Sequence, residues 1–191
     1  MENYIDLRFA VSDLISNRIM SDVFPRLVKQ AEATFNQRLR TVWQVQDATL
    51  YFDEGVAQLP FDFMEVLTLY GRGGRPMRAG MPSSSRVPCS GVYSIGNGSV
   101  TIGGFTGELD LNYYAQLPTL TVSPTACNWL LQRYPNAYLY GVGVEAAKFL
   151  RDAEQSVVID GLLAQELSAI NIDDERARWS GAIVRVQGLT P

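Results

Sequence analysis

The hydrophobic pattern of this chain changes period twice, and that change limits the folds open to it. Residues 1–44 and 118–181 place apolar side chains every three or four positions, which is the spacing of helices with one buried face. Between them, residues 45–117 alternate apolar and polar side chains in short runs, as half-buried strands do. Because two terminal helical segments can share one core, the pattern predicts an α+β fold: a helical bundle from both ends with an inserted antiparallel β domain.

The apolar spacing predicts five helices, over about 6–19, 22–39, 124–133, 135–151 and 154–178. Pro25 suits the first turn of the second helix, behind a cap at Ser21 or Asp22. Ser123-Pro124 predicts the start of the third helix in the same way. The residue before a proline avoids helical backbone, so Tyr134-Pro135 should separate the third helix from the fourth.

The third and fourth helical segments carry the residues expected inside the bundle. Trp129, Leu139 and Phe149 are predicted to lie in its interior. Gly141 and Gly143 interrupt the helical pattern, and each costs about 1 kcal/mol relative to alanine. That cost indicates close approach of another backbone, and helix packing within the chain is favoured over a subunit contact.

Two segments of the β region predict hairpins. The first is "ATLYFDEGVAQL", residues 48–59, and the second is "VYSIGNGSVTIGG", residues 92–104. In the second, Asn97-Gly98 supplies the positive φ angles of a tight type I′ turn. In "GELDLNYYA", residues 107–115, apolar and polar side chains should face opposite sides of one strand. The polar, proline-broken residues 81–91 predict a loop at the margin of the sheet.

The absence of histidine excludes most familiar hydrolases. It removes the usual nucleophile activation, the commonest general base and the usual zinc ligands. Cys89 and Cys127 lack a CxxC spacing, which favours a buried thiol pair in a reducing compartment over a metal site or a disulfide. Paired carboxylates could act as an acid and a base in principle, but the acids at 53–54 are typical of a turn and those at 173–175 of a solvated charged run. We therefore expect no catalytic residues, no cofactor, no metal and no enzyme activity.

The charge distribution gives one candidate contact region. The net charge is -4, so a general electrostatic footprint for nucleic acid is missing. No apolar run approaches the length of a membrane span and the N-terminus does not read as a signal peptide, so a soluble, unprocessed chain is expected. The one basic cluster, "GRGGRPMR" at 71–78, lacks the spacing of a phosphate loop. It predicts a flexible exposed turn, with a partner contact through Arg72, Arg75 and Arg78 as the alternative.

Several segments together resemble the head-to-tail adaptor family of tailed bacteriophages. They are "LPFDF" at 59–63, "YYAQLPTL" at 113–120, "NWLLQRYPNAYLYG" at 128–141, "EAAKFLRD" at 145–152 and "DERARWSGAIVRV" at 174–186. The resemblance implies a helical bundle with a β insertion, assembled as a homo-oligomeric ring, usually twelve-fold, beneath the portal protein. Gly141 and Gly143 depart from the family pattern, which prefers alanine or leucine there.

The resemblance also implies a function and a location. The chain is expected to be a virion structural protein at the head-tail junction, assembled in the host cytoplasm, that links the portal to tail or nozzle proteins. Viral double-stranded DNA would cross its central channel without specific binding, and an acidic ring suits that passage. The alternatives are a second-layer connector or tail-completion protein and, from a different class, a β-sandwich carbohydrate-binding module. The module would use the aromatic set Tyr51, Tyr70, Tyr93, Tyr113 and Tyr114.

The C-terminal arm, residues 182–191, is expected to be extended. Gly181 ends the helical pattern, and the residues after it alternate like a strand. A short strand needs a sheet edge, so the arm should bind a neighbouring chain, with a portal subunit favoured. The competing interpretation is a strand that completes this chain's own sheet. The predicted contact residues are Ile183, Val184, Arg185 and Val186.

Overall fold

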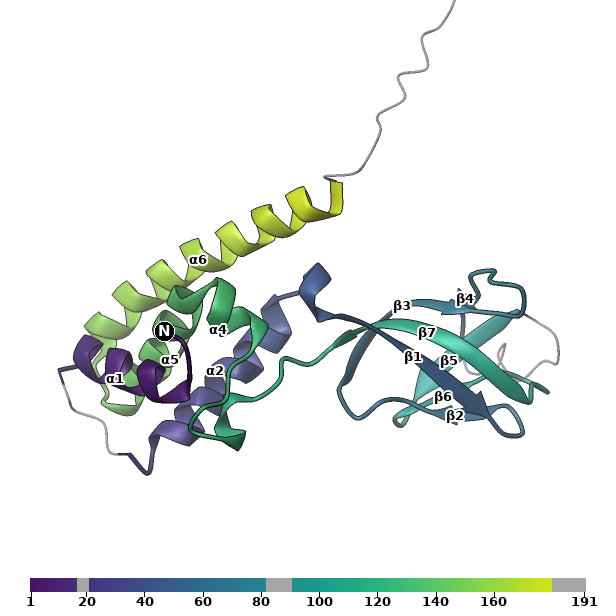
Figure 1. Cartoon of the computed structure of the whole chain (residues 1–191), viewed down its shortest axis with the longest axis horizontal. Helices are drawn as coiled ribbons and strands as arrows, with labels where there is room; N and C mark the ends of the chain where they lie inside the picture. The colour runs from purple at the N-terminus through teal and green to yellow at the C-terminus, as the bar shows by residue number, and fades with distance from the viewer. Residues whose placement is uncertain (17–20, 82–90, 180–191) are drawn as a thin grey trace, which may run out of the picture. The chain divides into compact units, whose positions relative to one another are not determined.

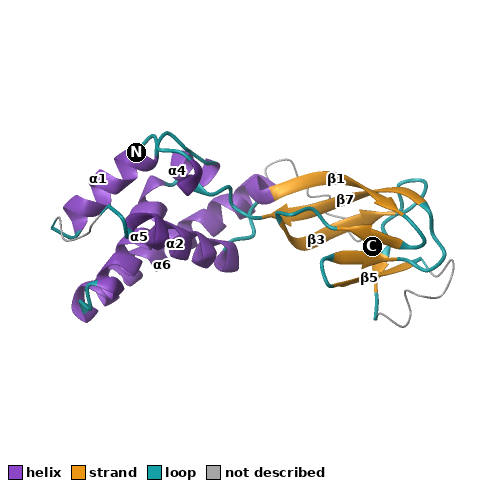
Figure 2. Ribbon diagram, turned by 90° about the horizontal axis from the view of Figure 1, so that it is seen from below, coloured by secondary structure: helices purple, strands orange, loops and turns teal. Residues whose placement is uncertain are grey.

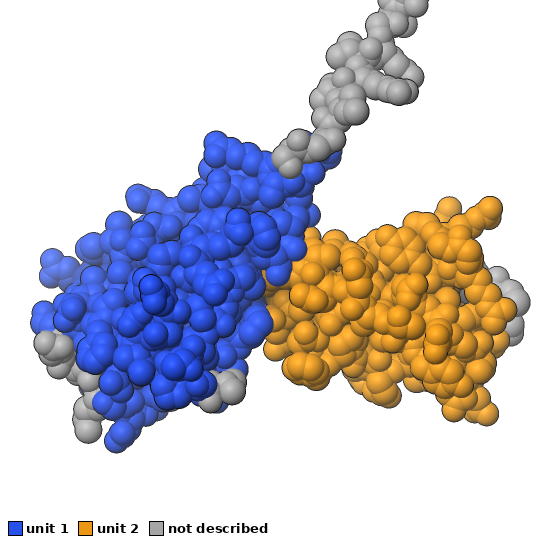
Figure 3. Space-filling view, viewed as in Figure 1, with its two compact units in different colours: residues 1–43, 117–191 blue, residues 44–116 orange. Residues whose placement is uncertain are grey.

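The computed structural model describes residues 1–16, 21–81 and 91–179 (Figure 1). The chain divides into two compact units, Met1–Trp43 with Leu117–Pro191 and Gln44–Gln116 (Figure 3). The α-helices belong to the first unit and the strands to the second, as the colours of Figure 2 show. The predicted α+β fold class is confirmed.

The helical unit is built around one helix that contacts all the others. This is α5, Pro135–Phe149, and its neighbours are α1 (Tyr4–Leu14), α2 (Phe24–Arg38), α4 (Trp129–Arg133) and α6 (Ala153–Trp179). Two short 3₁₀ turns, η1 (Val42–Gln44) and η2 (Leu120–Val122), lie outside these helices. In Figure 1, α5 is nearly enclosed by the other helices. A helix in that position must be apolar on most of its surface, and eight of its residues are buried.

The prolines predicted the ends of the helices correctly, but the predicted capping residues are wrong. Pro25 lies in the first turn of α2, and α4 ends at Arg133 before α5 begins at Pro135, as predicted. However, α2 has Val23 at its cap position with no side-chain hydrogen bond, so the predicted cap at Ser21 or Asp22 is wrong.

The predicted start of α4 at Ser123-Pro124 is also wrong. The side chain of Asn128 caps this helix by accepting a hydrogen bond from the Leu131 amide at 3.0 Å. Ser123 Oγ instead accepts from the Thr125 amide at 3.3 Å, which closes a local turn. Helix α1 likewise ends five residues before its predicted limit, and Ser16 just after it has a positive φ of 58°.

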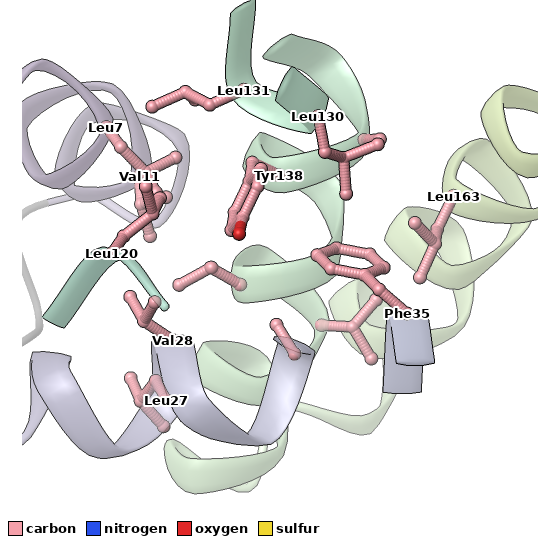
Figure 4. Close-up of a cluster of buried hydrophobic side chains, with 14 of the residues drawn as sticks. Leu7, Val11, Leu27, Val28, Phe35, Leu120, Leu130, Leu131, Tyr138 and Leu163 are labelled. Carbon is pink, nitrogen blue, oxygen red and sulfur yellow. The ribbon is translucent and has the colours of Figure 1, made fainter. Parts of the chain in front are cut away.

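The core of the helical unit joins α1, α2, α4, α5 and α6 (Figure 4). Tyr138 and Phe35 lie at its centre, with ring centroids 5.1 Å apart in an edge-to-face pair. The predicted interior residues lie further out. Trp129 and Leu139 are half-buried against the core, and Phe149 is 45% exposed, so its predicted burial is wrong. Phe149 occupies the last residue of α5, where the Arg26 guanidinium covers its ring at 5.5 Å.

The two glycines of α5 are explained by packing within the unit. A Cβ added at Gly141 would lie 2.8 Å from Cε1 of Phe35 and closer still to Cζ. A Cβ added at Gly143 would lie 2.8 Å from Cδ2 of Leu14 and 3.4 Å from Cγ2 of Ile159. The preference for packing within the chain is confirmed, but side chains make the close approach, where a backbone was expected.

The β unit contains two sheets instead of the single sheet expected. The first has the order β1-β7-β3, formed by Val45–Phe52, Gly107–Ala115 and Phe63–Tyr70. The second has the order β2-β6-β5-β4, formed by Val56–Gln58, Ser99–Thr101, Val92–Gly96 and Arg78–Ala79. All pairs are antiparallel except the short β4-β5 pair, which is parallel.

Both predicted hairpin turns form, although the strands that flank one of them do not pair with each other. Asn97 and Gly98 have φ of 51° and 73° between the paired strands β5 and β6. Glu54 and Gly55 turn the chain after β1, and Asp53 bonds Val56 in both directions. Beyond that turn β2 pairs with β6, so β1 and β2 belong to different sheets. Side chains at 109, 111 and 113 are buried while 108 and 110 are exposed, which confirms the predicted alternation in β7.

Candidate functional site

The most deeply buried acid of the helical unit has a structural role. Glu32, 5% exposed, accepts hydrogen bonds from the Leu120 amide at 2.8 Å, Thr119 Oγ1 at 2.7 Å and the Tyr138 hydroxyl at 3.2 Å. Asn128 Nδ2 donates to the same hydroxyl at 2.7 Å. Burial raises the pKa of Glu32 and of Tyr138. These bonds tie α2 and α5 to the chain before α4, which positions the elements of the core.

The basic segment 71–78 forms an ordered turn between β3 and β4. Gly71 N–H donates to Arg75 O at 2.8 Å, and Gly74 N–H donates to Gly71 O at 3.1 Å. Met77 N–H then returns to Leu69 O at 2.8 Å. Gly73 and Gly74 have φ of 79° and 73°, a conformation that suits glycine. The turn is exposed, as predicted, but these hydrogen bonds define its backbone.

The three arginines of this turn are exposed and have different surroundings. The Arg72 guanidinium lies over the Phe105 ring, 5.2 Å from its centroid, and donates to Thr106 O at 3.5 Å. Arg78 lies on β4, where its amide donates to Gly91 O. Arg72 and Arg75 line one hollow, which does not include Arg78. The structure therefore brings two of the three predicted contact residues together.

The hollow has a volume of about 340 Å³ and an apolar floor with a cationic rim. Its apolar lining comes from Met77, Ile102, Phe105 and Leu109. A guanidinium beside apolar surface suits a partner segment that carries a carboxylate next to an apolar side chain. Gly91 also lines the hollow. Of the loop predicted at 81–91, residues 82–90 lie outside the described residues, and Cys89 is among them.

The outward face of the three-stranded sheet is acidic, a property not predicted from the sequence. Asn112 Nδ2 donates to Asp47 Oδ1 at 2.7 Å, and Thr49 Oγ1 donates to Asp110 Oδ1 at 2.9 Å. No lysine or arginine occurs in β1, β3 or β7. The acids at alternate positions of "GELDLNYYA" could have indicated this acidic face. The exposed acids on these strands are Asp47, Glu65, Glu108 and Asp110.

Most of the tyrosines that a carbohydrate-binding module would use are buried in the β unit. Three of the five tyrosines are buried, and only Tyr51 and Tyr70 are exposed, by 64% and 37%. Tyr113 donates its hydroxyl to Asp62 Oδ1 at 3.0 Å, and burial with this bond raises its pKa to about 12. The tyrosines serve mainly as core residues.

The remaining predicted contact residues, Ile183, Val184, Arg185 and Val186, lie outside the described residues. Across the described ranges, no cluster of three cysteine or acidic side chains could hold a metal ion. No helix in the same ranges has the length and apolar character needed to cross a bilayer.

Comparison with protein families gives one match over nearly the whole chain. The family is described as SU10 adaptor protein, and the match covers residues 2–187. A search of curated proteins found no match.

Proposed function

The chain belongs to the SU10 adaptor protein family, and on that premise we propose that it forms a ring that docks on the portal and links it to the tail. Members of this family are structural adaptor proteins of bacteriophages, so the chain is a virion structural protein and its family is not an enzyme family. The observation that carries the proposal is the family match, which spans both units of the structure. A function restricted to one unit would not require both.

The proposed ring surrounds a channel through which viral DNA passes at the head-tail junction. The net charge of -4 is compatible with this role, because a strongly basic channel would retain phosphates. Assembly in the host cytoplasm and a twelve-fold ring belong to the same proposal.

We assign two contact regions to this function. The hollow beside Arg72 and Arg75 is proposed to receive an acidic and apolar segment of a tail protein or a neighbouring subunit, with Arg78 adding charge nearby. The C-terminal arm, with Ile183, Val184, Arg185 and Val186, is proposed to bind a neighbouring chain.

Native mass spectrometry of the chain, alone and mixed with its portal protein, tests the proposal. A ring-forming adaptor gives a discrete multimer on the portal, whose copy number follows from the mass. A second-layer connector binds only after another adaptor is present. A monomer that ignores the portal under all these conditions contradicts the proposed function.

A further inference from the structure

Strand β1 presents a long and regular edge among the described strands of the β unit, closed only at its end, where Asp53 bonds Val56. The second sheet ends in β2 and β4, which have three and two residues. The opposite edge of the first sheet, β3, has two register shifts against β7 and is partly closed by the turn that follows it. In contrast, β1 pairs with β7 over eight consecutive residues without a shift. Short or irregular edges prevent unwanted pairing, so a long regular edge indicates a pairing site.

The main-chain groups on the free side of β1 can be assigned from the pairing of its sheet. Leu69 O accepts from Met77 N–H outside the sheet, so Leu111, opposite Leu69, directs its main-chain groups to Ala48 of β1. The odd-numbered residues of β1 therefore face away from β7, and Asp53 on that side bonds Val56 in both directions. Residues two apart in a strand direct their main-chain groups to the same side. Tyr51, Thr49 and Asp47 therefore direct N–H and C=O groups to the free edge, where no other described strand pairs with them. The sequence of β1 contains neither proline nor lysine, the residues that commonly block an edge.

The side chains beside this edge determine which strand fits. The even-numbered residues Ala48, Leu50 and Phe52 pack against the core of the β unit, and the odd-numbered ones lie on the acidic outward face. An added strand should therefore be apolar on one side and basic on the other. Two copies of β1 pairing with each other would bring acidic faces together, which is unfavourable.

The C-terminal arm has this pattern. Ala182, Val184 and Val186 would extend the apolar side, while Ile183 and Arg185 would lie on the acidic side. Arg185 is the only charged residue of the arm. An added strand lies about 4.8 Å from β1, so an arginine side chain can reach across it. A hollow of about 390 Å³ lies there, lined in part by Asp47, Thr49 and Asp110.

We propose that the C-terminal arm of one copy of this chain pairs with the free edge of β1 in a second copy, with Arg185 received by Asp47 and Asp110. The inference rests on the proposed ring and names the contact that joins its neighbours. Residues 180–191, when extended, span about 40 Å at 3.3–3.6 Å per residue, a length that can bridge adjacent subunits. Main-chain hydrogen bonds between the two strands would stabilise this contact, and the charge pair would determine which strand binds.

Hydrogen exchange in a mixture of two chain forms tests this proposal. A ¹⁵N-labelled chain truncated after residue 181 is mixed with unlabelled full-length chain, and the labelled β1 peptide is followed by mass spectrometry. Only an arm from another molecule can protect that peptide, and we expect its exchange to slow at least tenfold. The labelled β2 and β3 peptides serve as internal controls and should not change.

Charge reversal tests the assigned pair. Full-length Arg185→Glu should lose the protection of β1, and Asp47→Arg in the labelled chain should restore it with that partner. Arg176→Glu, the same charge change at an exposed site on α6, is the matched control and should protect as the wild type does.

The outcomes separate this contact from the proposed function. Rings that form on portals without protection of β1 overturn the contact and leave the function standing. Protection that appears only within the full-length chain itself also overturns it. Protection in the mixture supports the contact even if no ring forms on portals, and that result contradicts only the proposed function.

Discussion

Replacing Gly141 by alanine should destabilise the helical unit, although alanine is the better helix former. The substitution gains about 1 kcal/mol of helix propensity. The added methyl group would overlap the Phe35 ring, since its carbon would lie 2.8 Å or less from two ring carbons that normally require about 3.5–4.0 Å.

The cost of that overlap depends on whether the ring can move. Phe35 is 1% exposed and packs edge-to-face on Tyr138, whose hydroxyl is bonded to Glu32 and Asn128. A shift of the ring therefore disturbs the centre of the core. Overpacking typically costs about 1–3 kcal/mol, and we take the upper end here. The net expectation is a loss of about 2 kcal/mol in the free energy of unfolding.

Urea unfolding followed by tryptophan fluorescence reports the stability of the helical unit, where the substitution lies. The three tryptophans, Trp43, Trp129 and Trp179, all belong to the helical unit. Gly161→Ala is the matched control, because an added Cβ there meets no atom within 4 Å, and it should stabilise by about 0.4–1 kcal/mol.

A double-mutant cycle identifies the cause. Phe35→Leu removes the ring edge, so in the Gly141→Ala background it should cost up to about 3 kcal/mol less than in the wild type, because the helix propensity of residue 141 cancels in the cycle. If Gly141→Ala proves as stable as the wild type, or more stable, the packing of Phe35 against α5 is refuted.

Three further predictions concern the core and the basic turn. Burial raises the pKa of Glu32 above 4.5, so its stabilising contribution is present below pH 4.5 and is lost as pH rises through the folded pKa; Glu32→Gln should flatten that dependence in urea titrations at several pH values, and an unchanged slope would contradict it. Leu130→Ala, at a fully buried site, should cost about 2–5 kcal/mol, whereas half-buried Trp129→Ala should cost less; the reverse order in thermal unfolding would mean that the indole is central. Changing the three arginines of turn 71–78 to serine should weaken attachment of tail proteins without lowering the melting temperature, and full attachment would show that they are only solvated.

The elements predicted correctly from the sequence are those fixed by local backbone chemistry. Proline at 135 ends α4 because the preceding residue avoids helical backbone. Asn97-Gly98 forms its turn because few other residue pairs accept two positive φ angles. Ser123-Pro124 failed for a related reason, since serine caps a turn as readily as a helix and Asn128 provides the cap.

Properties that depend on distant residues could not be predicted. A helical stripe shows which side of α5 is buried, but not that Phe149, at the end of that helix, is 45% exposed. The turn at Glu54-Gly55 was evident, but β2 pairs with β6, whose residues lie 41–45 positions further along the chain. That separation of β1 from β2 leaves the β1 edge free, so sequence periodicity alone could not identify it. Of the contact residues, Arg72 and Arg75 share a hollow only because Phe105 and the turn are brought together by the sheets.

The ring on the portal is the central claim, and cryo-electron microscopy of the chain mixed with purified portal protein tests it most directly. The account predicts a closed ring of this chain stacked coaxially on the portal, with an open channel wide enough for double-stranded DNA. Portal particles that carry no additional ring density, even with the chain in large molar excess over the portal protein, would contradict it.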